Sequence, residues 1–336
     1  YQKAMAARGV LSFTPTGNAV NLKLVYNRPN SSARAYLNFF EINAQRKLKL
    51  DGTYMPFQHT SLLGSGSYAH YKLSNATASV QIWDVTDAEN IGRVETTLTK
   101  DTLNFIAPAT TLKQFIALDP SQSAGFSKPE IIGSIDNQDL HAMPQAEMLI
   151  ITHSRFLSQA EKLAQAHRSM DNLRVNVVTN EQVFNEFSSG TPDATAYRRF
   201  AKMFYDRAKT TGTTADAPKY LLLFGKGTFD NRKLISTSGE NLILTYQADE
   251  SLNETQSYVT DDYFDFKKKK EGSSISSATL DLGVGRFPVK STDEADVVVN
   301  KTINYMKNAN NGKWKNQLCF LADDGDNALH MNQADN

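Results

Sequence analysis

The chain has 336 residues, 40% hydrophobic and 21% charged, with 36 basic and 36 acidic residues that cancel to a formal net charge of zero. This is the composition of a folded globular protein, and it argues against a nucleic-acid partner, because nucleic-acid-binding domains are normally strongly basic. At roughly 150 residues per domain the length predicts two domains. Apolar runs stay well below the ~20 residues of a transmembrane helix, so no membrane span is expected.

The first part of the chain, residues 1–126, is predicted to form a β-rich, sandwich-like domain. Ala19–Tyr26 alternates apolar and polar residues, which is the period of a half-buried strand. Arg34–Glu41 and Ala78–Trp83 have a similar pattern between turn-forming residues. Short strands at this spacing favour two packed antiparallel sheets.

A polar stretch, residues 127–144, is interpreted as a linker, and the pattern changes after it. Residues 145–336 alternate short apolar runs with amphipathic segments. The apolar runs are typical of strands that are covered on both faces. They are Met148–Thr152, Val175–Val178, Tyr220–Phe224 and Gln317–Leu321.

Helices are predicted between these strands. Ser158 with Glu161, and Ser291 with Glu294, have the spacing of capping boxes that open helices. Two apolar stripes at helical spacing follow, one through Tyr197, Phe200, Ala201, Phe204 and Ala208, and one through Ala295, Val298, Val299, Thr302, Ile303 and Met306. Alternating strands and helices predict a doubly wound, mostly parallel α/β sheet.

Ligand sites of such sheets lie beyond the carboxyl ends of the strands. Here those ends are His153, the loop Gly225–Asp230 and the loop Ala322–Asn327, to which we add Thr260–Asp265. Gly225-Lys226-Gly227 lacks the spacing of a phosphate-binding loop. His153 stands at a strand end, where most histidines only make a hydrogen bond.

Two acidic groups offer the hard oxygen ligands that calcium prefers. One contains Asp323, Asp324 and Asp326, and the other Asp261, Asp262 and Asp265. Neither has the spacing of an EF-hand, so a solvated, capped turn is the alternative interpretation. Zinc is disfavoured because a single cysteine and scattered histidines give no ligand spacing. That cysteine, Cys319, lies in the middle of an apolar run, which predicts a buried, inert thiol.

Several strings occur in an order that resembles the gingipain family of cysteine peptidases, caspase-like α/β proteins of Bacteroidetes. They are Asp281–Val289, Asn304-Tyr305, Trp314–Gln317, the predicted strand with Cys319 and the acidic loop from Asp323. Ala322–Met331 resembles the sortase members of the family that serve the type IX secretion system. Ile82–Asp87 and Ile151–His153 agree with this, so the resemblance covers about residues 78–336.

The resemblance implies a secreted endopeptidase or transpeptidase on the outer surface of a Gram-negative bacterium. Its partners are then other secretion components and protein substrates with a C-terminal sorting domain, which it removes before attaching the cargo to the cell surface. The family's catalytic histidine, in a Gly-His-Gly segment, and its cysteine are expected beyond Asn336, so this chain alone is expected to be inactive.

The resemblance also assigns roles to individual residues. Asp324 stands where the family has a carboxylate that orients the histidine, with Asp323 as the neighbouring choice. Met331 stands at the substrate-binding position where arginine-specific members carry an acidic residue. No cofactor is required, but calcium is common in the family, with Asp323, Asp326, Asp261 and Asp262 as candidate ligands. The alternative function is a non-catalytic cell-surface binding module, stabilised by calcium.

Overall fold

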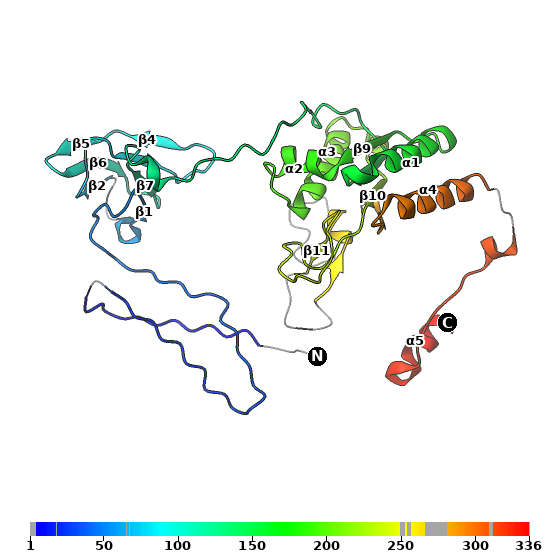
Figure 1. Ribbon diagram of the computed structural model, residues 1–336, viewed down its shortest axis with the longest axis horizontal. Helices are drawn as coiled ribbons and strands as arrows, with labels where there is room; N and C mark the ends of the chain where they lie inside the picture. Colours follow the sequence, from blue (N-terminus) through cyan, green and yellow to red (C-terminus); the bar gives the residue numbers. More distant parts are fainter. Residues whose placement is uncertain are drawn as a thin grey trace. The chain divides into compact units, whose positions relative to one another are not determined.

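The computed structural model describes residues 5–17, 19–64, 66, 68–248, 253, 257–265, 281–308 and 312–335. The chain divides into two compact units. One contains residues 13–135, and the other contains residues 1–12 and 136–336. Each unit is described by itself below (Figure 1).

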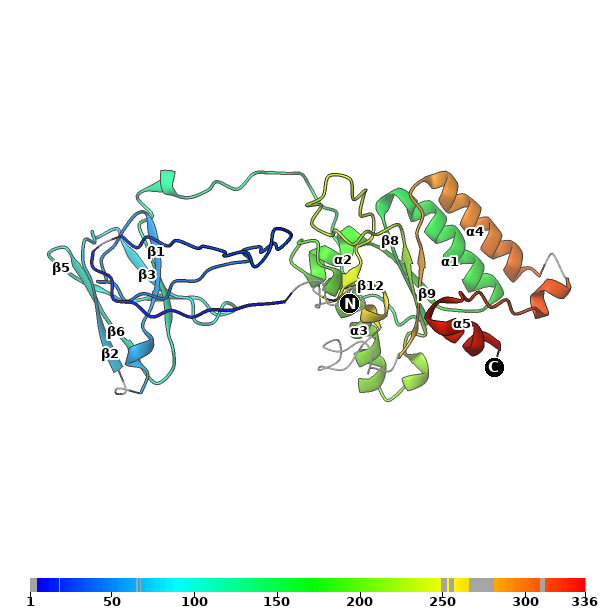
Figure 2. The same ribbon diagram turned by 90° about the horizontal axis from the view of Figure 1, so that it is seen from below.

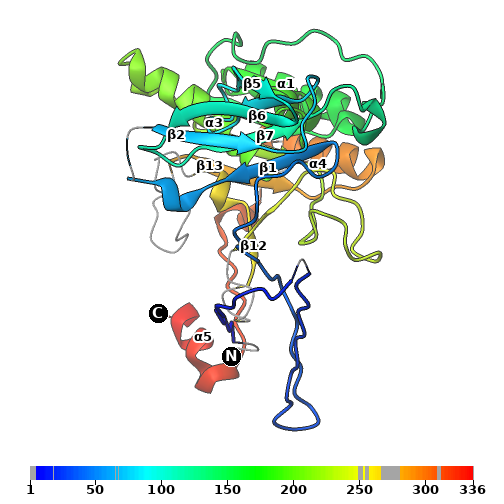
Figure 3. The ribbon, with the colours of Figure 1, turned by 90° about the vertical axis from the view of Figure 1, so that its left-hand side faces the viewer.

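The unit of residues 13–135 contains seven described strands. They are β1 (Tyr54–Gln58), β2 (Tyr68–Leu73), β3 (Gln81–Asp84), β4 (Gly92–Val94), β5 (Thr97–Thr99), β6 (Thr102–Pro108) and β7 (Gln114–Leu118). They form two antiparallel sheets with the orders β1-β7-β3-β4 and β2-β6-β5. Figure 3 shows β1 and β7 of one sheet and β2 and β6 of the other. Short 3-10 turns lie at Thr60–Leu62 and Ser123–Gly125.

One core joins the two sheets. The buried side chains of β2 alternate with exposed ones, as a one-sided strand requires. Tyr71 of β2 stacks on Phe105 of β6, with ring centroids 4.8 Å apart, and Phe115 of β7 meets both rings edge-on. Burial raises the pKa of the Tyr71 hydroxyl.

Two of the strands predicted for this unit are wrong. Residues 19–26 and 34–41 are extended, but they are exposed and belong to no strand. Alternation fits a pleated backbone, but a strand also needs a paired neighbour, and that pairing is not local. The third predicted strand, Ala78–Trp83, is present as β3, displaced by a few residues.

The second unit is an α/β structure, as predicted. Its main sheet has the order β13-β10-β8-β9, and all of its strands are parallel. The elements are β8 (Met148–Thr152), α1 (Leu157–Met170), β9 (Val175–Thr179), α2 (Asn180–Phe187), α3 (Ala194–Thr210), β10 (Tyr220–Phe224), β11 (Tyr246–Gln247), β12 (Val259–Thr260), β13 (Gly283–Phe287), α4 (Thr292–Met306) and α5 (Gly325–Asp335). Strands β11 and β12 pair antiparallel.

Helices cover both faces of this sheet (Figure 2). Alternate residues of each strand enter different cores, so Leu149 and Leu221 pack with α2 and α3, whereas Ile150 packs with α1 and α4. Helices α1 and α4 lie side by side (Figure 2), and Gln159 donates to Asp296 between them. The sheet therefore separates two cores, which is why its central strands read as continuous apolar runs.

Neither of the two predicted capping boxes is complete in the structure. Ser291 caps α4 as predicted and accepts a hydrogen bond from the Glu294 N–H, but the Glu294 carboxylate binds the Lys290 N–H instead of closing the box. Ser158 does not cap α1. The 3-10 turn Ser154–Phe156 precedes that helix, and His153 accepts from the Arg155 N–H at its start.

No helix of the described residues has both the length and the apolar character needed to span a membrane.

Candidate functional site

A cleft of about 340 Å³ lies at the carboxyl ends of β8 and β9. It is lined by His153, Asn180, Glu181 and Asn241 with the apolar side chains of Phe184 and Leu244. His153 follows β8 directly, and Asn180 follows β9 because the Thr179–Gln182 capping box ends that strand and opens α2. The parallel strands thus bring these side chains to one edge of the sheet, where α/β proteins hold their ligands.

His153 has a defined tautomer in this cleft. Its Nδ1 accepts a hydrogen bond of 3.1 Å from the backbone N–H of Arg155. Since a backbone N–H only donates, Nδ1 carries no proton, and the neutral ring carries its proton on Nε2. Nearby, Arg155 pairs with Glu240, and this contact lowers the pKa of the Glu240 carboxyl. The strand-end position predicted for His153 therefore gives a hydrogen-bonded ring.

The loop after β10 is held from inside by Asp230. Its carboxylate accepts from the N–H groups of Ile235 and Leu234 and from the Ser238 hydroxyl, at 2.7 to 2.9 Å. These bonds, led by the one from Ile235, lower the pKa of the Asp230 carboxyl. The phenol of Tyr197 packs beneath the same loop, and burial raises its pKa.

Gly225-Lys226-Gly227 has a packing role in this loop. A Cβ atom on Gly227 would stand 2.5 Å from Thr245 Cγ2 and 2.6 Å from the Ile243 carbonyl oxygen. Gly225 has a φ of +152°, and a Cβ atom on it would stand 2.8 Å from Ile243 Cγ1. The glycines allow the chain after β10 to run against the segment 241–245, which explains them without a phosphate ligand.

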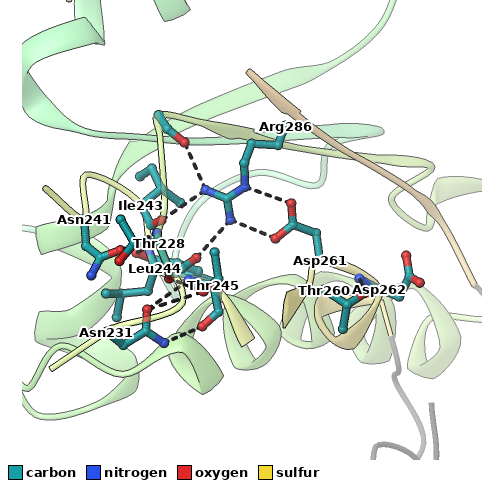
Figure 4. A network of polar contacts seen from close by, with 12 residues as sticks. Thr228, Asn231, Asn241, Ile243, Leu244, Thr245, Thr260, Asp261, Asp262 and Arg286 are labelled. Carbon is teal, nitrogen blue, oxygen red and sulfur yellow. Dashed lines mark hydrogen bonds and ion pairs between the residues drawn. The ribbon is translucent and has the colours of Figure 1, made fainter. Parts of the chain in front are cut away.

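Arg286 of β13 is the centre of the polar network in Figure 4. Its guanidinium forms two hydrogen bonds of 2.8 Å with the Asp261 carboxylate. Its remaining donors reach the carbonyl oxygens of Gly225, Ile243 and Leu244 at 2.9 to 3.0 Å. All five N–H donors of the side chain are used, so Arg286 joins three chain segments, at Gly225, at 243–244 and at Asp261, to β13.

Sequence reasoning missed this role of Arg286. The string Asp281–Val289 was used for the family resemblance and was not recognised as the strand β13. The available signal was the Arg286 charge inside the mostly apolar run Leu282–Val289.

Among the described residues, Asp261, Asp262 and Asp323 belong to no group of three or more potential metal-ligating atoms. Asp261 is bound on both oxygens by Arg286, so a cation would have to displace a guanidinium. Asp265 is fully buried and accepts from the N–H groups of Asp281 and Leu282. The oxygens of Asp261 and Asp265 thus accept hydrogen bonds from the chain itself, and calcium binding at Asp261 and Asp262 stays a prediction.

A further cluster of potential metal ligands lies where the segment 138–141 meets α2. Asp139, His141 and Glu186 place one potential metal-ligating atom each within 4.8 Å of one another. The Glu186 oxygens, however, already accept from the N–H groups of Leu140 and His141, from His141 Nδ1 and from Gln138. These bonds outweigh desolvation and lower the Glu186 pKa. Through these hydrogen bonds Glu186 holds the segment 138–141 against α2, and this explains the cluster better than a metal site does.

The remaining candidates lie near the described C-terminal end. Asp323 and Asp324 are exposed just before α5, and Met331 is half exposed on that helix. The side chain of Asp326 lies outside the described part. None of the described contacts joins Asp324 to His153 or to the cleft. The catalytic role of Asp324, the substrate role of Met331 and calcium binding at Asp323 and Asp326 stay predictions.

The prediction for Cys319 is wrong. Residues 317–323 form no strand, and Cys319 is exposed together with Leu318, Phe320 and Leu321. An apolar run becomes a buried strand only where a sheet edge receives it, and here the sheet ends at β13.

Comparisons with known proteins agree with this fold. The family model described as "Peptidase family C25" matches residues 141–336. A crystal structure of dimeric latent PorU from Porphyromonas gingivalis is similar at a TM-score of 0.68 and 37% sequence identity. The match covers 82% of this chain and 26% of the PorU chain, so this chain spans about a quarter of that length. A search of curated proteins found no match.

Proposed function

Since the chain belongs to peptidase family C25, the gingipain family, we propose that it is part of a secreted cysteine endopeptidase or sortase. The resemblance to this family, first recognised in strings such as Asp281–Val289 and Ala322–Met331, is confirmed by the family model and by the PorU structure. The observation that carries the proposal is the PorU match, which extends over both units of the chain.

The proposed reaction is removal of a C-terminal sorting domain from exported cargo, followed by transfer of the cargo to the cell surface of a Gram-negative bacterium. The proposed partners are that cargo and other components of the type IX secretion system. The nucleophilic cysteine and its histidine are proposed to lie outside residues 1–336. Cys319 is a poor candidate for the catalytic cysteine because none of the described contacts joins it to a histidine that could activate it.

Asp324 is the proposed positioning residue for that histidine. A carboxylate in this role holds the imidazole in one orientation and stabilises its charged form. The exposure of Asp324 next to the start of α5 leaves its carboxylate accessible to such a partner.

The test uses the full-length protein that contains this chain. Asp324→Asn is compared with Asp335→Asn, a carboxamide change on the same helix region. Cleavage of a cargo with a C-terminal sorting domain is expected to fall strongly for Asp324→Asn only, with a changed pH profile of kcat. All proteins carry Cys319→Ser, which removes the exposed thiol of this chain, and labelling of the active cysteine by a thiol-reactive probe should persist. Equal cleavage by both variants would exclude the role of Asp324, and an absence of cleavage and labelling in the wild type would exclude the peptidase.

A further inference from the structure

The positive charge of the chain is concentrated near its beginning. Of the 36 basic and 36 acidic residues, the first 50 residues hold eight basic and one acidic, which leaves 28 and 35 for the rest. The segment 13–49, called the basic arm below, contains one acidic residue, Glu41, and six basic ones. These are Lys23, Arg28, Arg34, Arg46, Lys47 and Lys49. A neutral protein thus carries a strongly basic element.

The basic arm also exposes large apolar side chains. Tyr36 is 91% exposed and Leu24 is 69% exposed, and aromatic residues alternate with the basic ones. The exposed set within the arm is Phe13, Val20, Leu22, Leu24, Val25, Tyr26, Tyr36, Leu37, Phe39, Phe40 and Ile42. Exposed apolar area of this extent is characteristic of an interaction surface.

The basic arm consists of two extended stretches of chain that run in opposite directions. The chain reverses direction at Asn30–Ala33, where the Asn30 side chain accepts from the N–H groups of Ser32 and Ala33 (Figure 1). The described residues 19–47 form no strand. The arm is fixed at one end, because Leu48 and Leu50 form backbone hydrogen bonds with Ser74. It is therefore a long element attached to the β unit at its base.

We propose that the basic arm binds a lipid surface with anionic headgroups. Lys and Arg side chains near such a surface gain roughly fivefold in binding per charge, and the attraction reaches about a Debye length. Tyr and Phe are suited to the headgroup region, where an apolar body and a polar edge are both accommodated. Positive charge and apolar side chains inserted into the lipid together supply the two contributions that stable peripheral membrane binding requires.

The distribution of side chains favours lipid over a protein partner. The six basic side chains outnumber Glu41 by five charges, and exposed apolar side chains such as Leu37 and Phe39 lie among them. Anionic headgroups attract this charge without a fixed complementary surface, and the adjoining acyl boundary accepts the apolar side chains. A protein partner would need acidic groups in a matching pattern, which the comparison with poly-glutamate tests.

The test measures sedimentation of the full chain with vesicles. Phosphatidylcholine vesicles are compared with vesicles in which a third of the lipid is phosphatidylglycerol. We expect binding to the anionic vesicles only, weakened by added salt. A variant with Lys23, Arg28, Arg34 and Lys47 changed to Gln loses four charges and is expected to bind on the order of several hundredfold more weakly. A control with Lys72, Lys209, Lys301 and Lys307 changed to Gln removes the same charge from exposed positions elsewhere and should bind as the wild type.

A second measurement does not depend on comparing variants of different stability. Phe39→Trp, combined with Trp83→Phe and Trp314→Phe, places the single tryptophan in the arm, and its emission should shift to the blue with anionic vesicles. A variant with Leu24, Phe39 and Phe40 changed to Ser should lose attachment. The proposal is overturned if the chain ignores anionic vesicles, if the control and arm variants weaken equally, or if soluble poly-glutamate or single-stranded DNA binds the arm as tightly as vesicles do.

Discussion

The guanidinium of Arg286 and the carboxylate of Asp261 meet side by side, with two hydrogen bonds of 2.8 Å, at the edge strand β13. Arg286 is 12% exposed and Asp261 is 26% exposed, so the pair is largely shielded from solvent. Bidentate pairs of this kind, in which a planar guanidinium donates two parallel hydrogen bonds to one carboxylate, are strong and directional. Through the carbonyl groups of Gly225, Ile243 and Leu244, the pair fixes the loops that follow β10.

Arg286→Ala is expected to lower the free energy of unfolding by about 3 kcal/mol, because it leaves a shielded carboxylate and three carbonyl groups without their donor. Arg286→Lys keeps the charge but not the planar fork and should recover only part of the loss. Urea denaturation measures both. Arg232→Ala, an exposed arginine of the neighbouring loop, is the matched control. A loss no larger than that of the control would show that the network is not important for stability.

Gly227→Ala is expected to destabilise the protein by about 2 kcal/mol, because its Cβ would overlap Thr245 and the Ile243 carbonyl group. Gly285→Ala is the control, since nothing lies within 4 Å of a Cβ at that position in β13. Thermal and urea denaturation of the two variants should differ clearly. Similar stabilities would mean that the loop moves aside without cost.

Cys319 is expected to react with a thiol reagent such as DTNB nearly as fast in the native protein as in urea, because its side chain is exposed. The readout is the rate of thionitrobenzoate release. Cys319→Ser provides the blank. Slow native labelling that accelerates on unfolding would indicate that residues 317–321 are buried against the sheet.

Glu186→Gln is expected to destabilise the docking of the segment 138–141. The folded pKa of Glu186 is lowered, so its contribution is present above the unfolded value of about 4.3 and is lost as the pH falls through the folded pKa. The difference in unfolding free energy between wild type and Glu186→Gln should therefore shrink below about pH 5. Glu161→Gln, a half-exposed helix residue, is the control. A difference that grows toward acid would contradict this sign.

Local patterns predicted the parallel sheet well. Tyr220–Phe224 and Met148–Thr152 could be recognised because strands covered on both faces are continuously apolar. Strand β13 was missed because Gly283, Gly285 and Arg286 interrupt its apolar character, and it lies at the sheet edge where one side remains open.

The wrong strand predictions fall in segments whose structure depends on pairing with residues far away in the sequence. The alternation in Ala19–Tyr26 and the apolar run around Cys319 describe residues that suit a strand, but neither contains information about which edge would pair with it. For the candidate site, His153 could be located from the end of β8. The Arg286–Asp261 pair joins residues 25 positions apart, and no local pattern predicts such a contact.

Asp265 accepts hydrogen bonds from the two residues, Asp281 and Leu282, at which the chain re-enters the sheet before β13. One buried carboxylate thus fixes the chain directly before β13. The start of β13, and with it the pairing of Tyr220 with Gly283 in the β10–β13 register, is therefore set by a side chain as well as by strand pairing.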